Sequence, residues 1–136
     1  GIKNVYDVAA RAMSAQIVRM NAIASNLANA NNVSGNKEEV FKPLRPVFKT
    51  IYADQLKQTG LSTVDAIRVE TLNREPIKTY QPNHPAADEE GYIFKAAVDM
   101  DEEMVEMLET QRQYTNNIEV LNTIRNLNMR TLNIGK

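Results

Sequence analysis

The chain has 136 residues, a net charge of −1 and no cysteine. This length suits one domain, the near-zero charge argues against a nucleic-acid or anionic-membrane partner, and the absence of cysteine excludes disulfides and thiol chemistry. The sequence contains no run of 18 apolar residues, so no membrane span is predicted. Residues 1–6 lack the apolar core of a secretory signal, so export would use another route or follow removal of a signal.

The first predicted element is a long N-terminal helix that ends near Asn31, Asn32 and Gly35. Alanine, a strong helix former, is abundant within it. Its apolar or small residues recur at alternating steps of three and four, which is typical of a heptad-like seam. This line consists of Tyr6, Ala9, Met13, Gln16, Met20, Ile23, Leu27 and Ala30.

The middle of the chain, residues 35–98, has a different pattern. Short apolar runs are separated by five prolines and two glycines, which predicts two to four short strands in a small β-rich or loop-rich module. The clearest strand covers residues 65–72, where the side chains roughly alternate. Gln81–Pro85 contains two prolines, so we expect an extended connector there.

A second long helix is predicted over residues 99–136. Acidic residues crowd its start and Arg125 and Arg130 come late, an order that complements the helix dipole. We therefore predict an α+β fold. Its two long terminal helices form an antiparallel coiled-coil-like pair, and residues 1–34 with 99–136 make a discontinuous helical core domain around the middle module.

Antiparallel pairing makes specific charge contacts testable. It places Arg19 near Glu109 and Arg11 near Glu119, whereas Lys3 meets Arg130. Each favourable pair contributes little. The acids between residues 99 and 106 face a helix end without bases, so we expect them to contact solvent or another subunit.

Asparagine is a mediocre helix former, yet both predicted helices are rich in it. These asparagines either form a polar outer face with caps, or lie buried in subunit contacts where their amides fix the register. They are Asn21, Asn26, Asn29, Asn31 and Asn32 in the first helix, and Asn116, Asn117, Asn122, Asn126, Asn128 and Asn133 in the second.

Residue types that carry catalysis are sparse. The single histidine, His84, has no histidine or cysteine partner, so a metal or general-base role is not expected. The acidic run 99–109 reads as a solvated helix start, with a cell-wall hydrolase that uses these carboxylates kept as an alternative. No phosphate-binding glycine loop or basic aromatic patch occurs. We predict no enzymatic activity, cofactor, metal, nucleic acid or small-molecule substrate.

Three blocks resemble the bacterial flagellar rod, hook and hook-associated axial proteins, and most of all a proximal rod subunit. The first block is Ser25-Asn26-Leu27-Ala28-Asn29-Ala30-Asn31, followed by Val33-Ser34-Gly35. The second is Tyr80–Asp88 with Gly91-Tyr92 and Val98-Asp99, and the third is Arg112–Thr123 with Leu132–Lys136. Ala96-Ala97 stands where a Pro-Asn pair is usual. The resemblance covers nearly the whole chain and is weakest over residues 40–73.

The resemblance implies a structural subunit that polymerises with itself and other rod proteins into a hollow drive shaft across the periplasm. It implies type III export without a cleaved Sec signal, and contact with the junction at the membrane ring and export gate. The alternative is a cytoplasmic helical adaptor or export chaperone. The residues that we assign to assembly are Ser25, Asn26, Leu27, Ala28, Asn29, Arg112, Tyr114, Asn117, Leu121 and Asn122.

Two further expectations concern assembly. Replacing Asn26 or Asn117 with leucine should abolish motility with little effect on secretion. The ends of the free monomer should be frayed and become ordered on assembly, because isolated helices are marginally stable.

Overall fold

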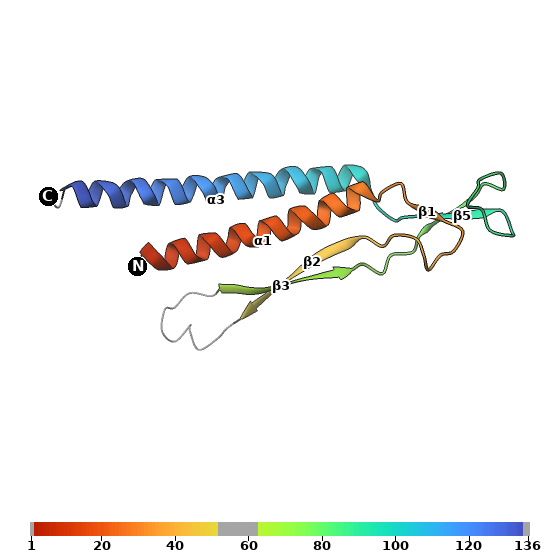
Figure 1. The fold of residues 1–136 in the computed structure, drawn as a ribbon, viewed down its shortest axis with the longest axis horizontal. Helices are drawn as coiled ribbons and strands as arrows, with labels where there is room; N and C mark the ends of the chain where they lie inside the picture. Colours follow the sequence, from red (N-terminus) through yellow and green to blue (C-terminus); the bar gives the residue numbers. More distant parts are fainter. Residues whose placement is uncertain (1, 52–62, 135–136) are drawn as a thin grey trace.

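The computed structural model describes residues 2–51 and 63–134 (Figure 1). Helix α1 spans Ile2–Ala28 and helix α3 spans Met100–Ile134. The two helices pack side by side and run in opposite directions, so both ends of the chain lie at the same end of the molecule. The predicted α+β class and the antiparallel terminal helices are confirmed.

Helix α3 begins with a side-chain cap. The Asp99 carboxylate oxygen Oδ1 accepts hydrogen bonds from the backbone N–H groups of Asp101 and Glu102, at 3.0 and 3.2 Å. These N–H groups have no partner inside the helix, and an aspartate at this position satisfies them. The acidic residues in the first turn also face the positive end of the helix dipole.

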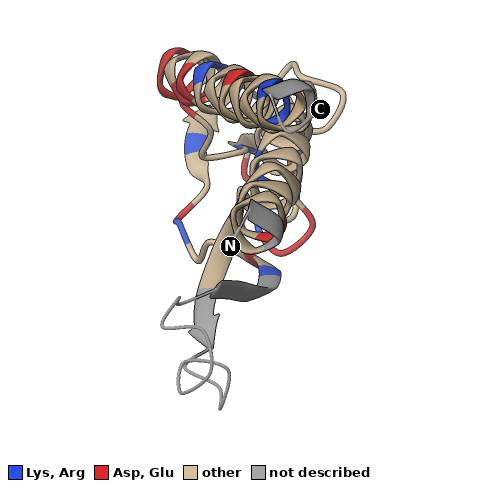
Figure 2. Cartoon of the chain, turned by 90° about the vertical axis from the view of Figure 1, so that its left-hand side faces the viewer, with Lys and Arg blue, Asp and Glu red and all other residues tan. Residues whose placement is uncertain are grey.

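A long β-hairpin runs along α1 on the side away from α3, so the molecule is layered as α3, α1 and hairpin (Figures 1 and 2). Its strands are β2, Leu44–Ile51, and β3, Thr63–Thr71. They pair antiparallel from Leu44 opposite Thr71, with an irregularity between Lys49 and Thr50. The strand predicted over residues 65–72 is confirmed, with bounds that differ slightly.

A small three-stranded sheet lies beyond the opposite end of the helical pair (Figure 1). It has the order β1-β5-β4, with β1 at Val33–Ser34, β4 at Ile77–Tyr80 and β5 at Tyr92–Lys95. All pairs are antiparallel. Because β1 follows α1 directly and β5 leads into α3, this sheet joins the two helices at one end.

The connection between β4 and β5 differs from the expected extended connector. It is a series of turns, in which the His84 N–H donates to the Gln81 carbonyl and the Ala87 N–H to the His84 carbonyl, both at 3.0 Å. Pro82 and Pro85 each follow the first residue of such a turn. Proline fits that position because its fixed φ suits a turn as well as an extended chain.

Gly91 closes this connection with a φ of +88°. A Cβ atom there would lie 2.8 Å from the Tyr80 ring and 3.3 Å from the Pro82 backbone. Glycine is therefore required both for the left-handed backbone and for the close approach. Across the same sheet face, the Lys78 ammonium lies 4.3 Å from the centre of the Tyr92 ring, a cation–π contact.

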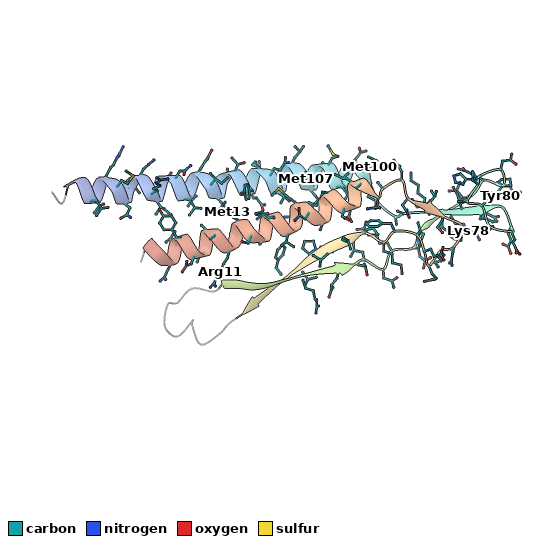
Figure 3. All side chains as sticks on the ribbon, in the orientation of Figure 1. Arg11, Met13, Lys78, Tyr80, Met100 and Met107 are labelled. Carbon is teal, nitrogen blue, oxygen red and sulfur yellow. The ribbon has the colours of Figure 1, made fainter. Side chains whose placement is uncertain are left out.

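The buried core is thin and rich in alanine. Among the residues that the structure describes, its larger apolar members are Ile23, Val40, Pro43 and Ile93. Figure 3 shows Met13 pointing from α1 into the space between the helices, whereas Arg11 leaves α1 towards the hairpin. The remaining buried apolar residues are Ala9, Ala15, Ala22, Ala30 and Ala96. Small side chains let the three layers approach closely, but they bury little apolar area per residue.

Candidate functional site

Asn26 lies at the centre of the molecule's main junction. Its side chain is 2% exposed. Its Oδ1 accepts from the Leu44 N–H at 2.7 Å, and its Nδ2 donates to the Leu44 carbonyl at 3.0 Å and to Glu103 Oε2 at 3.2 Å. One amide thus joins α1, β2 and α3. This is a contact within one chain, and the subunit contact of Asn26 stays a prediction from the sequence.

Two further asparagines continue this pattern at intervals of three residues. Asn29 Nδ2 donates to the Ser25 carbonyl at 2.9 Å, and the same carbonyl also accepts from the Asn29 backbone N–H at 3.1 Å. Asn32 Oδ1 accepts from the Phe41 N–H at 2.9 Å. The Asn-Leu-Ala-Asn block and the residues after it therefore shape the chain where α1 ends, which resembles the capping role that the sequence leaves open.

The junction continues to the start of α3. The Ala96 backbone N–H donates to the Asn32 carbonyl at 3.0 Å, and Ala96 is fully buried. A proline at this position would lack this donor. In this chain, alanine therefore provides a backbone hydrogen bond between the exit of α1 and the entry to α3.

Helix α1 has two packing faces. The heptad-like seam faces α3, where Gln16 Nε2 donates to Gln113 Oε1 at 2.9 Å. The second face contains Ala15, Ala22 and Asn26, which lie within about 40° of one another around the helix, and Asn26 bonds the hairpin. This second face is not among the features predicted from the sequence. The signal available for it was the seven-residue spacing of Ala15 and Ala22, both buried.

The ion pair that Arg19 makes with α3 differs from the predicted one by about one turn. Arg19 pairs with Glu106 rather than Glu109. Glu109 instead accepts two hydrogen bonds from Arg112 at 2.9 Å, within α3. Arg112, three residues along the same helix, already pairs with Glu109. Arg19 therefore pairs with Glu106. The acids at the start of α3 are thus partly satisfied within the chain, contrary to the prediction.

A groove of about 740 Å³ opens between the first turns of α3 and the hairpin, over α1. Glu103 lies on its wall, half-buried, and burial raises the pKa of its carboxyl above the ordinary value. The hydrogen bond from Asn26 opposes this shift, as does the charge of Arg74. The groove is lined by side chains of both signs of charge.

The third block, Arg112–Thr123, lies further along α3 than the junction. Arg112 is exposed and bound to Glu109, and Asn122 is exposed. Tyr114, Asn117 and Leu121 are half-buried. Because Gln113 lies opposite Gln16, this block faces the middle and start of α1. The structure therefore does not bring it together with the Ser25–Asn29 block, in which Asn26 is buried, Ser25, Leu27 and Asn29 are half-buried and Ala28 is exposed.

Large apolar side chains remain exposed on both helices, which is typical of a surface covered by other subunits. On α3 they reach 65% exposure at Val105 and 64% at Leu132. The others on this helix are Met100, Met104, Leu108, Val120, Leu127 and Met129, and α1 adds Val5, Val8 and Ile17.

His84 is a turn residue whose Nδ1 accepts from the Ala86 N–H at 3.0 Å. Within residues 2–51 and 63–134, no group of three or more acidic, histidine or cysteine side chains could hold a metal ion. For the same part of the chain, neither long helix has an apolar stretch sufficient to cross a membrane.

Comparison with known families matches both ends of the chain. The model of the flagella basal body rod protein family matches residues 7–37, and the model of the FlgEFG protein C-terminal region of the flagellar basal body rod matches residues 89–134. These ranges contain most of α1 and α3 and the junction between them. Fold and family models together define the class, a rod-type axial protein built on paired terminal helices.

Individual relatives match along the whole length. The flagellar basal-body rod protein FlgC of Escherichia coli O6:H1 is 35% identical, and those of Yersinia enterocolitica and Salmonella typhimurium are 36% identical. Each alignment covers 98% of this chain and 97% of the relative. The chain belongs to the FlgC family of flagellar basal-body rod proteins.

Proposed function

We propose that this protein is a structural subunit of the flagellar basal-body rod, the shaft that transmits torque across the periplasm. The observation that carries the proposal is the similarity to FlgC proteins over 98% of the chain, including both helices and the segments that join them. The exposed apolar side chains of α1 and α3 support it, because a polymer subunit must keep contact surface free until it assembles.

In this proposal, residues 1–34 and 99–136 form the inner helical wall around a central channel, and residues 35–98 lie outside it. Neighbouring subunits or α1 then contact Tyr114, Asn117 and Leu121. Asn122 is exposed, so only neighbouring subunits contact it. The partners are further copies of the chain, other rod proteins and the junction at the membrane ring and export gate. The thin, alanine-rich core supports passage through the type III export apparatus, since a chain with little buried apolar area unfolds easily.

The proposal includes no enzymatic activity. The carboxylates near the start of α3 have structural partners, with Glu103 bound by Asn26 and Glu106 by Arg19. Replacing Glu102, Glu103 and Glu106 together with glutamine should leave peptidoglycan cleavage by the cells unchanged. A loss of cleavage in that variant would favour the hydrolase alternative.

The decisive experiment deletes the gene in its own host and supplies a tagged copy from a plasmid. We expect the deletion strain to lose swimming and complete basal bodies. The tagged chain should restore both and be found in purified basal bodies by immunoblotting. A swimming deletion strain, or a chain that restores swimming but stays in the cytoplasmic fraction, would argue against a rod subunit and for an adaptor.

A further inference from the structure

We propose that the outer edge of strand β4 binds an extended segment of another protein, which adds to the small sheet as a further antiparallel strand and places a carboxylate beside Lys78. This inference goes beyond the proposed rod function and does not depend on it. Strand β4, Ile77–Tyr80, is an edge strand in the order β1-β5-β4. Figure 3 shows Lys78 and Tyr80 at the end of the molecule far from both chain ends.

Backbone groups along this edge point away from the sheet. The Gln81 N–H donates to the Gly91 carbonyl at 2.9 Å, so these residues form a hydrogen-bonded pair of the β4–β5 ladder. Such pairs alternate with pairs that exchange no bonds in an antiparallel ladder. Thr79 therefore bonds to β5, whereas the N–H and C=O groups of Lys78 and Tyr80 point away from it. An incoming strand finds two donors and two acceptors there, at the spacing of a sheet.

The edge is exposed and lacks the usual protection. All four residues of β4 are exposed, with Ile77 at 50% and Tyr80 at 61%, and in the described part of the chain no strand pairs with this edge. Natural edge strands are commonly protected by a proline, a bulge or a charged side chain. The register of β4 with β5 is regular, and Pro76 precedes the strand without interrupting it.

Lys78 is the charged residue of β4, and its side chain lies inward from the edge. Its ammonium is 4.3 Å from the centre of the Tyr92 ring and 6.0 Å from the centre of the Phe94 ring. Both rings belong to β5, so the side chain extends across the sheet and away from the outer edge. The backbone groups of the edge therefore stay accessible, while a positive charge remains close beside them.

The charge of Lys78 determines which strand fits. Among the described residues no carboxylate pairs with it, and aromatic ring faces balance its charge. A wholly apolar strand would displace water from the ammonium without supplying a counter-charge, which is costly. A strand with a carboxylate on the same face supplies it, so acidic strands bind and apolar or basic strands are rejected. A second copy of β4 would add another lysine to this face and does not fit.

The side chains on either side of the carboxylate are also constrained. Lys78 and Tyr80 share one face because alternate residues of a strand point the same way, and Ile77 lies on the other face. Exposed apolar and aromatic side chains favour β-branched neighbours across a strand pair. The occupant is thus an extended segment with an acidic residue between β-branched residues. A short edge gives a weak site, which suits a partner already held close by other contacts.

Titration of the full-length protein with a short synthetic strand tests the site. The probe is acetyl-Thr-Val-Glu-Val-Thr-amide, and nuclear magnetic resonance follows the backbone amides of the protein. We expect the Lys78 and Tyr80 amides to shift downfield because their N–H groups gain acceptors, whereas the Thr79 amide, already bonded to β5, shifts less. The dissociation constant should be about 1–5 mM. The same peptide with lysine in place of glutamate should bind at least about fivefold more weakly.

Charge exchange provides a matched pair of variants. In Lys78→Glu we expect the preference to reverse, so that the lysine peptide binds better than the glutamate peptide. A reversed preference also demonstrates that the variant sheet is folded. Arg125→Glu makes the same change of charge at an exposed position of α3, far from the small sheet, and should keep the wild-type preference.

Methylated peptides test the strand pairing itself. When the peptide glutamate lies on the face of Lys78 in an antiparallel pair, its own N–H faces the edge, whereas the N–H groups of the two valines face away. Methylation of the glutamate nitrogen should therefore weaken binding by at least about fivefold, and methylation of either valine nitrogen by less than about twofold.

The outcomes separate clearly. A reversed charge preference together with the alternating effect of methylation supports strand addition at β4. Absence of shifts at Lys78 and Tyr80 at about 10 mM peptide, an unchanged preference in Lys78→Glu, equal losses from all methylated peptides, or self-association of the wild type through residues 77–80 would each overturn it. None of these results bears on incorporation into basal bodies, which decides the rod function separately.

Discussion

Asn26 illustrates how one amide can organise three elements. It is 2% exposed, and its three hydrogen bonds join α1 to Leu44 and Glu103. Asn26→Leu would fill a similar volume but leave both backbone groups of Leu44 without this partner. Buried polar groups that lose their partner cost about 1–3 kcal/mol each, so we expect the free energy of unfolding to fall by about 2–4 kcal/mol, measured by urea denaturation.

The matched control is Asn122→Leu, at an exposed position of α3. It should change monomer stability by less than about 0.5 kcal/mol and affect motility only if Asn122 contacts a neighbour. Motility alone cannot separate these roles, since Asn26→Leu is expected to abolish it through folding as well as assembly. Equal stability of the wild type and Asn26→Leu would contradict the structural role and favour a pure subunit contact.

Glu103 gives a pH dependence with a defined sign. Burial raises the pKa of its carboxyl above the ordinary value of 4.5, so the folded state favours the protonated form. The resulting stabilisation is present below pH 4.5 and is lost as the pH rises through the folded pKa. Glu103→Gln keeps an acceptor for Asn26 without the charge. It should therefore match or slightly exceed the wild type at pH 7, by less than about 1 kcal/mol.

The measurement is urea unfolding of both proteins from pH 4 to pH 8. We expect any advantage of Glu103→Gln to shrink towards acid pH. Glu102→Gln, at the exposed neighbouring position, is the control for removing one negative charge from the start of α3. A Glu103→Gln variant clearly less stable than the wild type at pH 7 would mean that the ionised carboxylate stabilises the junction.

Among the elements, helices could be predicted from the sequence better than the position of the hairpin. Local signals predict both helices: the steps of three and four between apolar residues in α1, and the order of charges in α3. Both helices form where these signals predict them. The hairpin's strands also have local signals, but its position along α1 depends on Asn26 and on Ala15 and Ala22, which look unremarkable in an alanine-rich helix. The predicted pair of Arg19 with Glu109 was wrong because Arg112, only three residues from Glu109 in the same helix, pairs with that carboxylate.

The start of α3 offers a test of an isolated element. Asp99→Ala removes the oxygen that accepts from the Asp101 and Glu102 N–H groups, whereas Asp99→Asn keeps a capping oxygen. We expect Asp99→Ala to lower the free energy of unfolding by about 1 kcal/mol and Asp99→Asn by only a few tenths. Thermal unfolding followed by circular dichroism would distinguish the two, and equal losses would show that charge near the helix dipole matters more than the cap.

At the scale of the whole molecule, stability is expected to be uneven. Buried residues and long-range hydrogen bonds concentrate around Asn26, Asn32 and Ala96, whereas α3 beyond Val120 exposes most of its large apolar side chains. Segments with few buried contacts open most readily. The sequence predicts disorder at both ends of the free monomer. From the structure we expect local stability to decrease gradually from the junction towards the chain ends.

Hydrogen exchange can measure that gradient directly. In the dilute monomer we expect backbone amides of residues 20–30 and 100–110 to exchange slowly, and those of residues 120–132 to exchange quickly, because an unpartnered helix end has little to hold it. In purified basal bodies the protection should extend over residues 120–132, as neighbouring subunits cover their apolar side chains. Residues 92–95 of the small sheet, which are paired within the chain, serve as an internal reference that assembly should change little. Slow exchange throughout α3 in the dilute monomer would contradict coupled folding and assembly, and would indicate a helical pair that is complete before it reaches the rod.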